Sequence, residues 1–83
     1  MSESMNTSRL LWACRRGMKE LDVLLQPFAQ HCYEKLDAKD QQTFEYLLSF
    51  EDPTLFAWFM REETCQDATL NAMIERIREQ RYS

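Results

Sequence analysis

The chain has 83 residues, of which 45% are hydrophobic and 29% are charged, with one glycine, two prolines and a formal net charge of −4. This composition indicates one small globular domain with little room for an enclosed catalytic cavity, and the scarcity of turn-forming residues favours helices over strands. The acidic balance argues against binding to nucleic acid, and no apolar run reaches the roughly 20 residues that a membrane-spanning helix needs.

The first predicted helix is short and runs from Ser8 to Arg16. Thr7 or Ser8 can cap its first amides, and the basic side chains of Arg15 and Arg16 suit the negative end of the helix dipole. Gly17, the only glycine of the chain, fits the position just after the helix because glycine adopts a left-handed backbone at little cost. The pattern predicts a sharp bend over residues 15–20, which we call the corner, with its charges facing outward.

A second helix is predicted from about Met18 to Glu34. Its apolar residues recur at steps of three and four and therefore share one face: Met18, Leu21, Leu24, Leu25, Phe28 and Cys32. Pro27 interrupts the run and removes one internal hydrogen bond. We expect a bend or a loosened turn there, so that the helix has two segments.

A third and a fourth helix begin at acidic residues. Asp37 is a predicted N-cap with Asp40 in the following turn, and the apolar stripe of this helix is Phe44, Leu47 and Leu48. Asp52 is the predicted cap of a fourth helix from Pro53 to Arg61. Residues 55–60 of that helix are apolar on every side, so either neighbouring helices surround them or part of the run is an exposed patch.

The fifth predicted helix follows Asp67 as its cap, with Leu70, Met73, Ile74 and Ile77 at the same three-four spacing. Short connections between the elements predict neighbouring helices that pack roughly antiparallel. The predicted fold is therefore all-α, a compact five-helix bundle forming one domain over residues 1–83. We expect residues 1–7 and 79–83 to fray.

Residue types that carry chemistry are sparse in this chain. Cys14, Cys32 and Cys65 are far apart, which fits free thiols in a reducing compartment and offers no metal-ligand spacing. His31 is the single histidine, and no nucleophile motif surrounds it. The polar start lacks the order of a secretory signal. We therefore expect a cytoplasmic protein without catalytic residues, metal or a stably bound cofactor.

The corner allows two readings. A basic last turn, a glycine and an acidic first turn are what the physics of helix ends would select by itself. However, Arg15, Arg16, Lys19 and Glu20 cannot all point inward on so short a segment, so several charges should face solvent around a rigid turn. Trp12 lies one turn earlier, and a tryptophan beside an exposed arginine is a typical anchor of protein interfaces.

The run from Trp12 to Asp22 resembles the signature of the SdhE family of flavinylation factors, which carry an Arg-Gly-x-x-Glu motif. The similarity extends to the Pro27-Phe28 step, the stripe from Phe44 to Leu48, and Asp52-Pro53 with the aromatic residues after it. The resemblance implies a five-helix fold and a role as an assembly factor rather than as an enzyme.

Members of this family bind the flavoprotein subunit of succinate dehydrogenase, and in bacteria also that of fumarate reductase, and promote covalent attachment of FAD to a histidine of that subunit. By matching positions, the resemblance implies that Arg16, Gly17 and Glu20 contact the flavoprotein. Arg15 and Trp12 are added here as neighbours of the motif. We expect the free protein to be a monomer.

Two alternatives remain at this point. Some relatives have been described as antitoxins, which would make the chain a regulatory binding protein that counters an inhibitor of cytoskeletal polymerisation. The other alternative is a helical adaptor that uses the apolar patch at residues 55–60.

Overall fold

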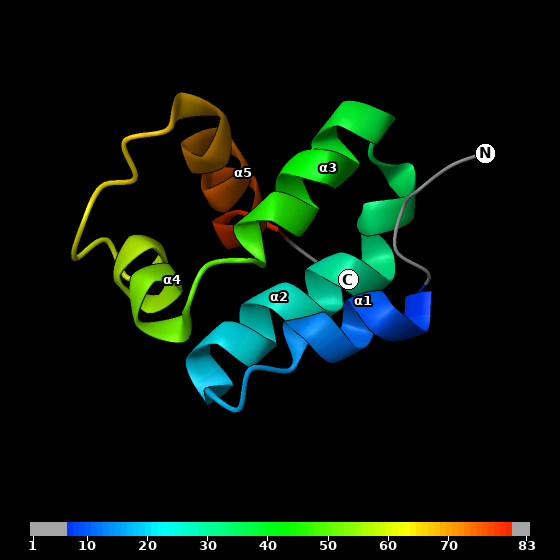
Figure 1. Ribbon diagram of the computed structural model, residues 1–83, viewed down its shortest axis with the longest axis horizontal. Coiled ribbons are helices and arrows are strands. Elements are labelled where there is room, and N and C mark those ends of the chain that lie inside the picture. The colour runs from blue at the N-terminus through cyan, green and yellow to red at the C-terminus, as the bar shows by residue number, and fades with distance from the viewer. Residues whose placement is uncertain (1–6, 81–83) are drawn as a thin grey trace.

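Helices account for most of the computed structural model, which describes residues 7–80 (Figure 1). The elements are α1 (Thr7–Cys14), α2 (Lys19–His31), the 3-10 helix η1 (Tyr33–Lys35), α3 (Ala38–Leu47), α4 (Asp52–Phe59) and α5 (Ala68–Arg78). Residues 7–80 contain no strand. The predicted all-α fold with five helices is confirmed.

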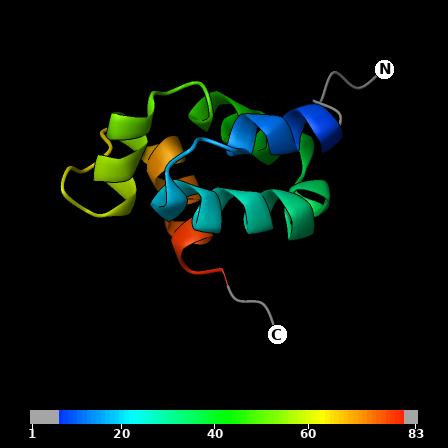
Figure 2. The same cartoon turned by 90° about the horizontal axis from the view of Figure 1, so that it is seen from below.

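Helices α1 and α2 lie side by side and run in opposite directions, joined by the corner (Figure 2). The first helix ends at Cys14, so the predicted end at Arg16 is wrong by two residues. Gly17 has a φ of +80°, the left-handed conformation expected of it. Helix α2 then starts at Lys19, and Met18 before it is extended.

Pro27 does not divide the second helix. It lies inside α2, which continues to His31, and the change of structure comes only at Cys32, where η1 follows. The carbonyl that Pro27 leaves without an internal donor belongs to Val23, whose side chain is 57% exposed, so water can reach this part of the helix. The division between the two expected segments therefore comes at Cys32 rather than at Pro27, and the second segment is the short 3-10 turn.

Two of the three predicted acidic caps are confirmed. Asp37 Oδ1 accepts the Asp40 amide at 2.8 Å, and Asp67 Oδ1 accepts the amides of Thr69 and Leu70 at 2.9 and 3.1 Å. The third prediction is wrong, because Asp52 is the first residue of α4 rather than its cap.

The fourth helix ends earlier than predicted, at Phe59. A Schellman motif satisfies the free carbonyls at the C-terminal end of this helix. The amides of Arg61 and Glu62 donate to the carbonyls of Trp58 and Ala57 at 3.3 and 2.8 Å. Arg61 takes the left-handed position there, with a φ of 62° and no glycine. The chain can therefore not continue as a helix to Arg61.

The core lies between α2, α3, α4 and α5, with α1 covering one side of α2. Its largest fully buried side chains are Phe44, Phe59, Leu10, Leu21, Leu25, Leu47, Leu55, Ile74, Ile77 and Cys14. The ring of Phe44 packs against those of Phe28 and Tyr33, with centroids 5.3 and 5.9 Å away. The apolar stripes predicted for the third and fifth helices are all buried.

The apolar run at residues 55–60 is divided between core and surface. Leu55 and Phe59 are buried, whereas Met60 is exposed and the three residues between Leu55 and Phe59 are half-buried. Neighbouring helices thus surround part of this run, and the rest is exposed at the surface, so each of the two expectations is partly met.

Most of the residues expected to fray lie outside the described part of the chain. Within it, Thr7 begins α1, and Gln80 after α5 donates from its side chain to the Leu24 carbonyl at 2.8 Å. Among residues 7–80, no helix is long and apolar enough to cross a membrane.

A candidate protein-docking corner

Hydrogen bonds from two backbone amides fix the shape of the corner. After α1 ends, the Arg15 amide bonds the Trp12 carbonyl at 3.1 Å, and the Arg16 amide donates to Asp22 Oδ1 at 2.8 Å. Asp22 lies in the first turn of α2, where a carboxylate is favoured by the helix dipole. The chain therefore reverses around Gly17 in one defined geometry.

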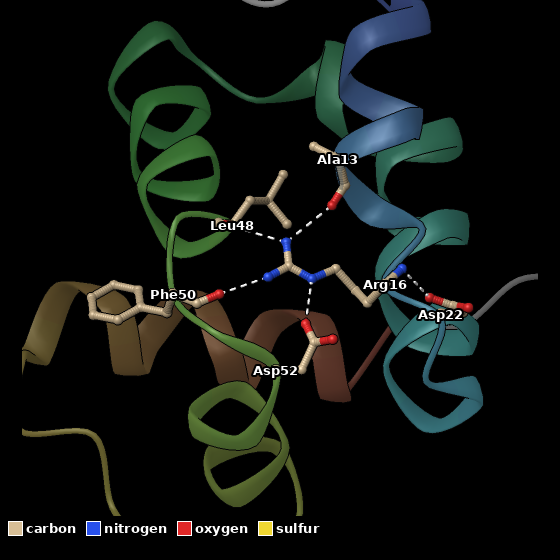
Figure 3. A network of polar contacts seen from close by, with 6 residues as sticks. All are labelled: Ala13, Arg16, Asp22, Leu48, Phe50 and Asp52. Carbon is tan, nitrogen blue, oxygen red and sulfur yellow. Dashed lines mark hydrogen bonds and ion pairs between the residues drawn. The ribbon is translucent and has the colours of Figure 1, made fainter.

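The guanidinium of Arg16 points away from solvent, into the gap between the corner and the connection from α3 to α4 (Figure 3). Its Nε donates to Asp52 Oδ1 at 2.7 Å, and Nη1 donates to the carbonyls of Ala13 and Leu48 at 3.1 and 2.9 Å. Nη2 donates to the Phe50 carbonyl at 2.6 Å. The side chain is only 15% exposed.

The prediction that Arg16 faces outward is therefore wrong. The end of α1 and the α3–α4 connection leave carbonyl oxygens without helical donors, and a planar guanidinium can serve several of them at once. Asp52 supplies the counter-charge, which offsets part of the cost of burying the guanidinium. Arg16 thus joins three separate segments of the fold.

The other predicted residues do lie at the surface. Trp12 is 69% exposed, and the Arg15 guanidinium carbon lies 5.2 Å from the centre of its ring, within cation–π range. These two residues line a shallow depression of about 440 Å³ together with Arg9 and Ala13. An exposed tryptophan held against an arginine is ready to be covered by a partner.

Gly17 and Glu20 are exposed as well. A Cβ built on Gly17 would meet nothing within 4 Å, so the backbone of the corner is open to an approaching molecule. Within residues 7–80, the side chain of Glu20 has no hydrogen bond or ion pair to a neighbour. Its carboxylate is available to a partner, as predicted for the outward-facing charges of the corner.

Sequence reasoning missed three residues of this region. Val23 lies one turn after Glu20 on the same side of α2 and exposes an apolar side chain. The exposure of Val23 could have been predicted, because its position does not follow the three-four spacing of the buried face of this helix. Asp22 and Asp52 hold Arg16, but Asp52 is 36 positions away along the chain and no local pattern connects the two.

Cys14 lies directly under the corner and is fully buried. Burial raises the pKa of this thiol from 9.0 to about 12, and the positive charge of Arg16 opposes that rise only in part. The proton is therefore lost by the unfolded chain first. Between about pH 9 and pH 12, the free energy of unfolding should fall as the pH rises.

We expect Cys14 to resist alkylation in the folded protein. At pH 8 the folded thiol is protonated and inaccessible, so iodoacetamide should label the half-buried Cys32 well before Cys14. Peptide mass spectrometry after timed labelling measures both rates. Addition of denaturant serves as the control, since it should make the rates similar. Equal rates in the native protein would contradict the burial of Cys14.

Among the described residues, no group of three His, Cys, Asp or Glu side chains is placed to hold a metal ion. The candidate site consists of the exposed Trp12, the open backbone at Gly17 and the exposed Glu20, on the turn that the hydrogen bonds of Arg16 fix.

Comparison with known proteins identifies the family. The model of a family described as flavinator of succinate dehydrogenase matches residues 8–81. The chain belongs to this family. Its match includes the corner and all five helices, so the resemblance inferred from the Arg-Gly-x-x-Glu motif is confirmed.

Individual relatives agree with this assignment. The chain is 60% identical over 72 residues to the FAD assembly factor SdhE of Colwellia psychrerythraea, and the aligned region covers 87% of this chain and 79% of that protein. It is 53% identical over 76 residues to the factor of Shewanella oneidensis, covering 92% and 93%. It is 48% identical over 77 residues to the factor of Pseudomonas aeruginosa, covering 93% and 92%. The contacts of single residues with a partner stay a prediction.

Proposed function

We propose that this chain is an assembly factor that binds the flavoprotein subunit of succinate dehydrogenase and promotes covalent attachment of FAD to it. Membership of the flavinator family supports the activity. The observation that supports the location is the corner, where Trp12, Gly17 and Glu20 are exposed above a network that holds the turn rigid. Fumarate reductase, whose flavoprotein is the analogous subunit, is proposed as a second client.

The chain acts in this proposal as a binding protein rather than as an enzyme, and FAD belongs to the client. In this attachment a histidine nitrogen of the client would bond a methyl carbon of the flavin, while that carbon loses a proton and the flavin ring takes up two electrons; the step is slow unless the two groups are held in line. A rigid partner that binds the aligned arrangement of the flavoprotein more tightly raises the population of that arrangement. A preference of about 1.4 kcal/mol is enough for a tenfold rise.

Each exposed residue has a separate role in docking. Trp12 supplies apolar area with little entropy to lose, and Arg15 is held against its ring at 5.2 Å. Gly17 allows the partner's backbone to come close because no side chain stands above it. Glu20 accepts charge-assisted hydrogen bonds. Arg16 contributes indirectly, because its hydrogen bonds fix the shape of the turn that presents the exposed residues.

The remaining parts of the proposal concern the state of the protein. The free chain is proposed to be a monomer in the cytoplasm that holds no cofactor stably. Affinity purification of the tagged chain from cells tests the class of partner. A flavoprotein subunit is the expected partner. Recovery of a toxin-like membrane protein instead would favour the antitoxin alternative, and recovery of an unrelated protein would favour the adaptor.

Trp12→Ala and Glu20→Gln are expected to weaken binding to the flavoprotein without changing the fold. Loss of an interface tryptophan costs about 2 kcal/mol or more, which is roughly a 30-fold weaker Kd, and loss of the Glu20 charge about 1 kcal/mol. Isothermal titration calorimetry measures both. Glu34→Gln is the matched control, because Glu34 is also exposed but lies on η1 away from the corner. Unchanged affinity in both corner variants would remove the corner from the interface.

A further inference from the structure

A second exposed aromatic cluster lies on the side of the fold formed by the end of α3 and by α4. Tyr46 and Phe50 meet edge to face with ring centroids 5.2 Å apart, and Phe50 and Trp58 do the same at 5.0 Å. Tyr46 is 55% exposed, and the other two rings are half-buried. The three rings form one wall of a depression of about 330 Å³.

The rest of the lining, which we call the acidic wall, contains two carboxylates and otherwise uncharged side chains. It is formed by the connection between α4 and α5, with the exposed side chains of Glu63 and Asp67, and no basic residue lines it. Arg61 is the one basic residue of that connection, and its guanidinium is bonded to Glu75 Oε1 at 2.8 Å. Neither carboxylate is thus paired with a basic side chain of the described connection, and Asp67 uses Oδ1 to cap α5.

Aromatic rings and carboxylates that line one depression can together receive a cation. The faces of tyrosine and tryptophan attract an ammonium or guanidinium group within about 6 Å, and a nearby carboxylate adds a charge-assisted hydrogen bond. A neutral apolar side chain would fill the space but leave the acidic wall without a partner. Charge complementarity therefore selects a positively charged occupant.

We propose that this depression, which we call the aromatic–acidic pocket, receives a lysine or arginine side chain of the flavoprotein partner. The inference rests on the proposed function and adds a second contact to the corner. The two surfaces are mechanically connected, because the Phe50 carbonyl accepts the Arg16 Nη2 hydrogen bond at 2.6 Å. Figure 3 shows the Phe50 ring directed away from the guanidinium that its carbonyl holds.

The test neutralises the acidic wall while preserving the fold. Glu63→Gln changes an exposed side chain, and Asp67→Asn keeps the cap of α5 because asparagine caps helices as well as aspartate does. The double variant should bind the purified flavoprotein subunit about three- to tenfold more weakly at low salt, mainly through a slower association rate. Surface plasmon resonance measures the rates, and the difference should shrink as salt is raised.

Glu62→Gln is the matched control, because Glu62 is exposed on the same connection but does not line the pocket. It should bind like the wild type. An equal loss in this control would show that general acidity is responsible and would overturn the pocket. Tyr46→Leu keeps most of the apolar area but removes the aromatic face, so it should also weaken binding by about two- to threefold.

The outcomes separate this inference from the proposed function. If the wild-type chain binds the flavoprotein and the Glu63→Gln/Asp67→Asn variant binds equally well, the pocket is wrong and the proposed function stands. If the wild-type chain does not bind the flavoprotein, the proposed function fails and the pocket fails with it. Circular dichroism melting of each variant, with Glu63→Gln also made singly, verifies that the fold is retained.

Discussion

Arg16→Ala is expected to lower the free energy of unfolding by about 2–4 kcal/mol, far more than a surface substitution would. The variant loses the ion pair with Asp52 and the side-chain hydrogen bonds to three carbonyls. Those carbonyls belong to the end of α1 and to the α3–α4 connection, so this connection should loosen from the corner. Urea denaturation followed by circular dichroism measures the loss.

Arg15→Ala is the control for this prediction. Arg15 has the same side chain one position earlier but is exposed and contacts the Trp12 ring. Its loss should change stability by no more than about 0.5 kcal/mol, while binding to the flavoprotein weakens. Arg16→Lys should fall in between, because an ammonium group cannot serve acceptors in the directions that a guanidinium reaches. If Arg16→Ala were as stable as Arg15→Ala, the network would not hold the fold together.

Gly17→Arg is expected to weaken flavoprotein binding by at least about 100-fold, which is about 2.7 kcal/mol. The long side chain would stand where the partner's backbone approaches. The substitution also has a conformational cost, because any L residue at a φ of +80° is strained by about 1–2 kcal/mol. That cost is small enough for the fold to survive, and a Cβ meets nothing within 4 Å.

Gly17→Ala separates the two effects. Alanine has nearly the same backbone strain as arginine but adds only a methyl group, so both variants should melt at similar temperatures and differ in affinity. Gly17→Asn should be the most stable of the three substitutions, since asparagine tolerates the left-handed conformation best. Equal affinity of the alanine and arginine variants would show that no partner approaches the corner closely.

Local features of this fold could be predicted from the sequence, because their causes lie within a few residues. The caps at Asp37 and Asp67 each bond an amide two or three positions away, and the buried faces repeat at the helical period. The left-handed Gly17 could be predicted because a glycine just after a helix end adopts that conformation at little cost. The exposure of Trp12 agrees with its interpretation as an interface anchor beside an exposed arginine.

The inward direction of Arg16 could not be predicted in this way. Its acceptors come from residues 13, 48, 50 and 52, which meet only once the helices have packed. Before packing, Asp52 beside a proline has the pattern of a helix cap, and an arginine at a helix end has the pattern of a solvated charge. The tertiary contact overrides both local preferences.

This difference changes the meaning of the motif. One arginine of the corner is internal, whereas its neighbours Arg15, Gly17 and Glu20 are at the surface. A binding defect in an Arg16 variant would therefore reflect a change in the shape of the corner. Defects in Glu20 or Trp12 variants would reflect loss of direct contacts.

The most direct test of the account is in-gel flavin fluorescence of the purified flavoprotein subunit, first lacking covalent flavin and then incubated with FAD. With this chain present, covalent flavin should appear at least about tenfold faster than without it, and the Trp12→Ala/Glu20→Gln double variant should lose that acceleration while remaining folded. Equal flavin attachment with and without the chain would contradict the proposed function. Full acceleration by the double variant would contradict docking through the corner.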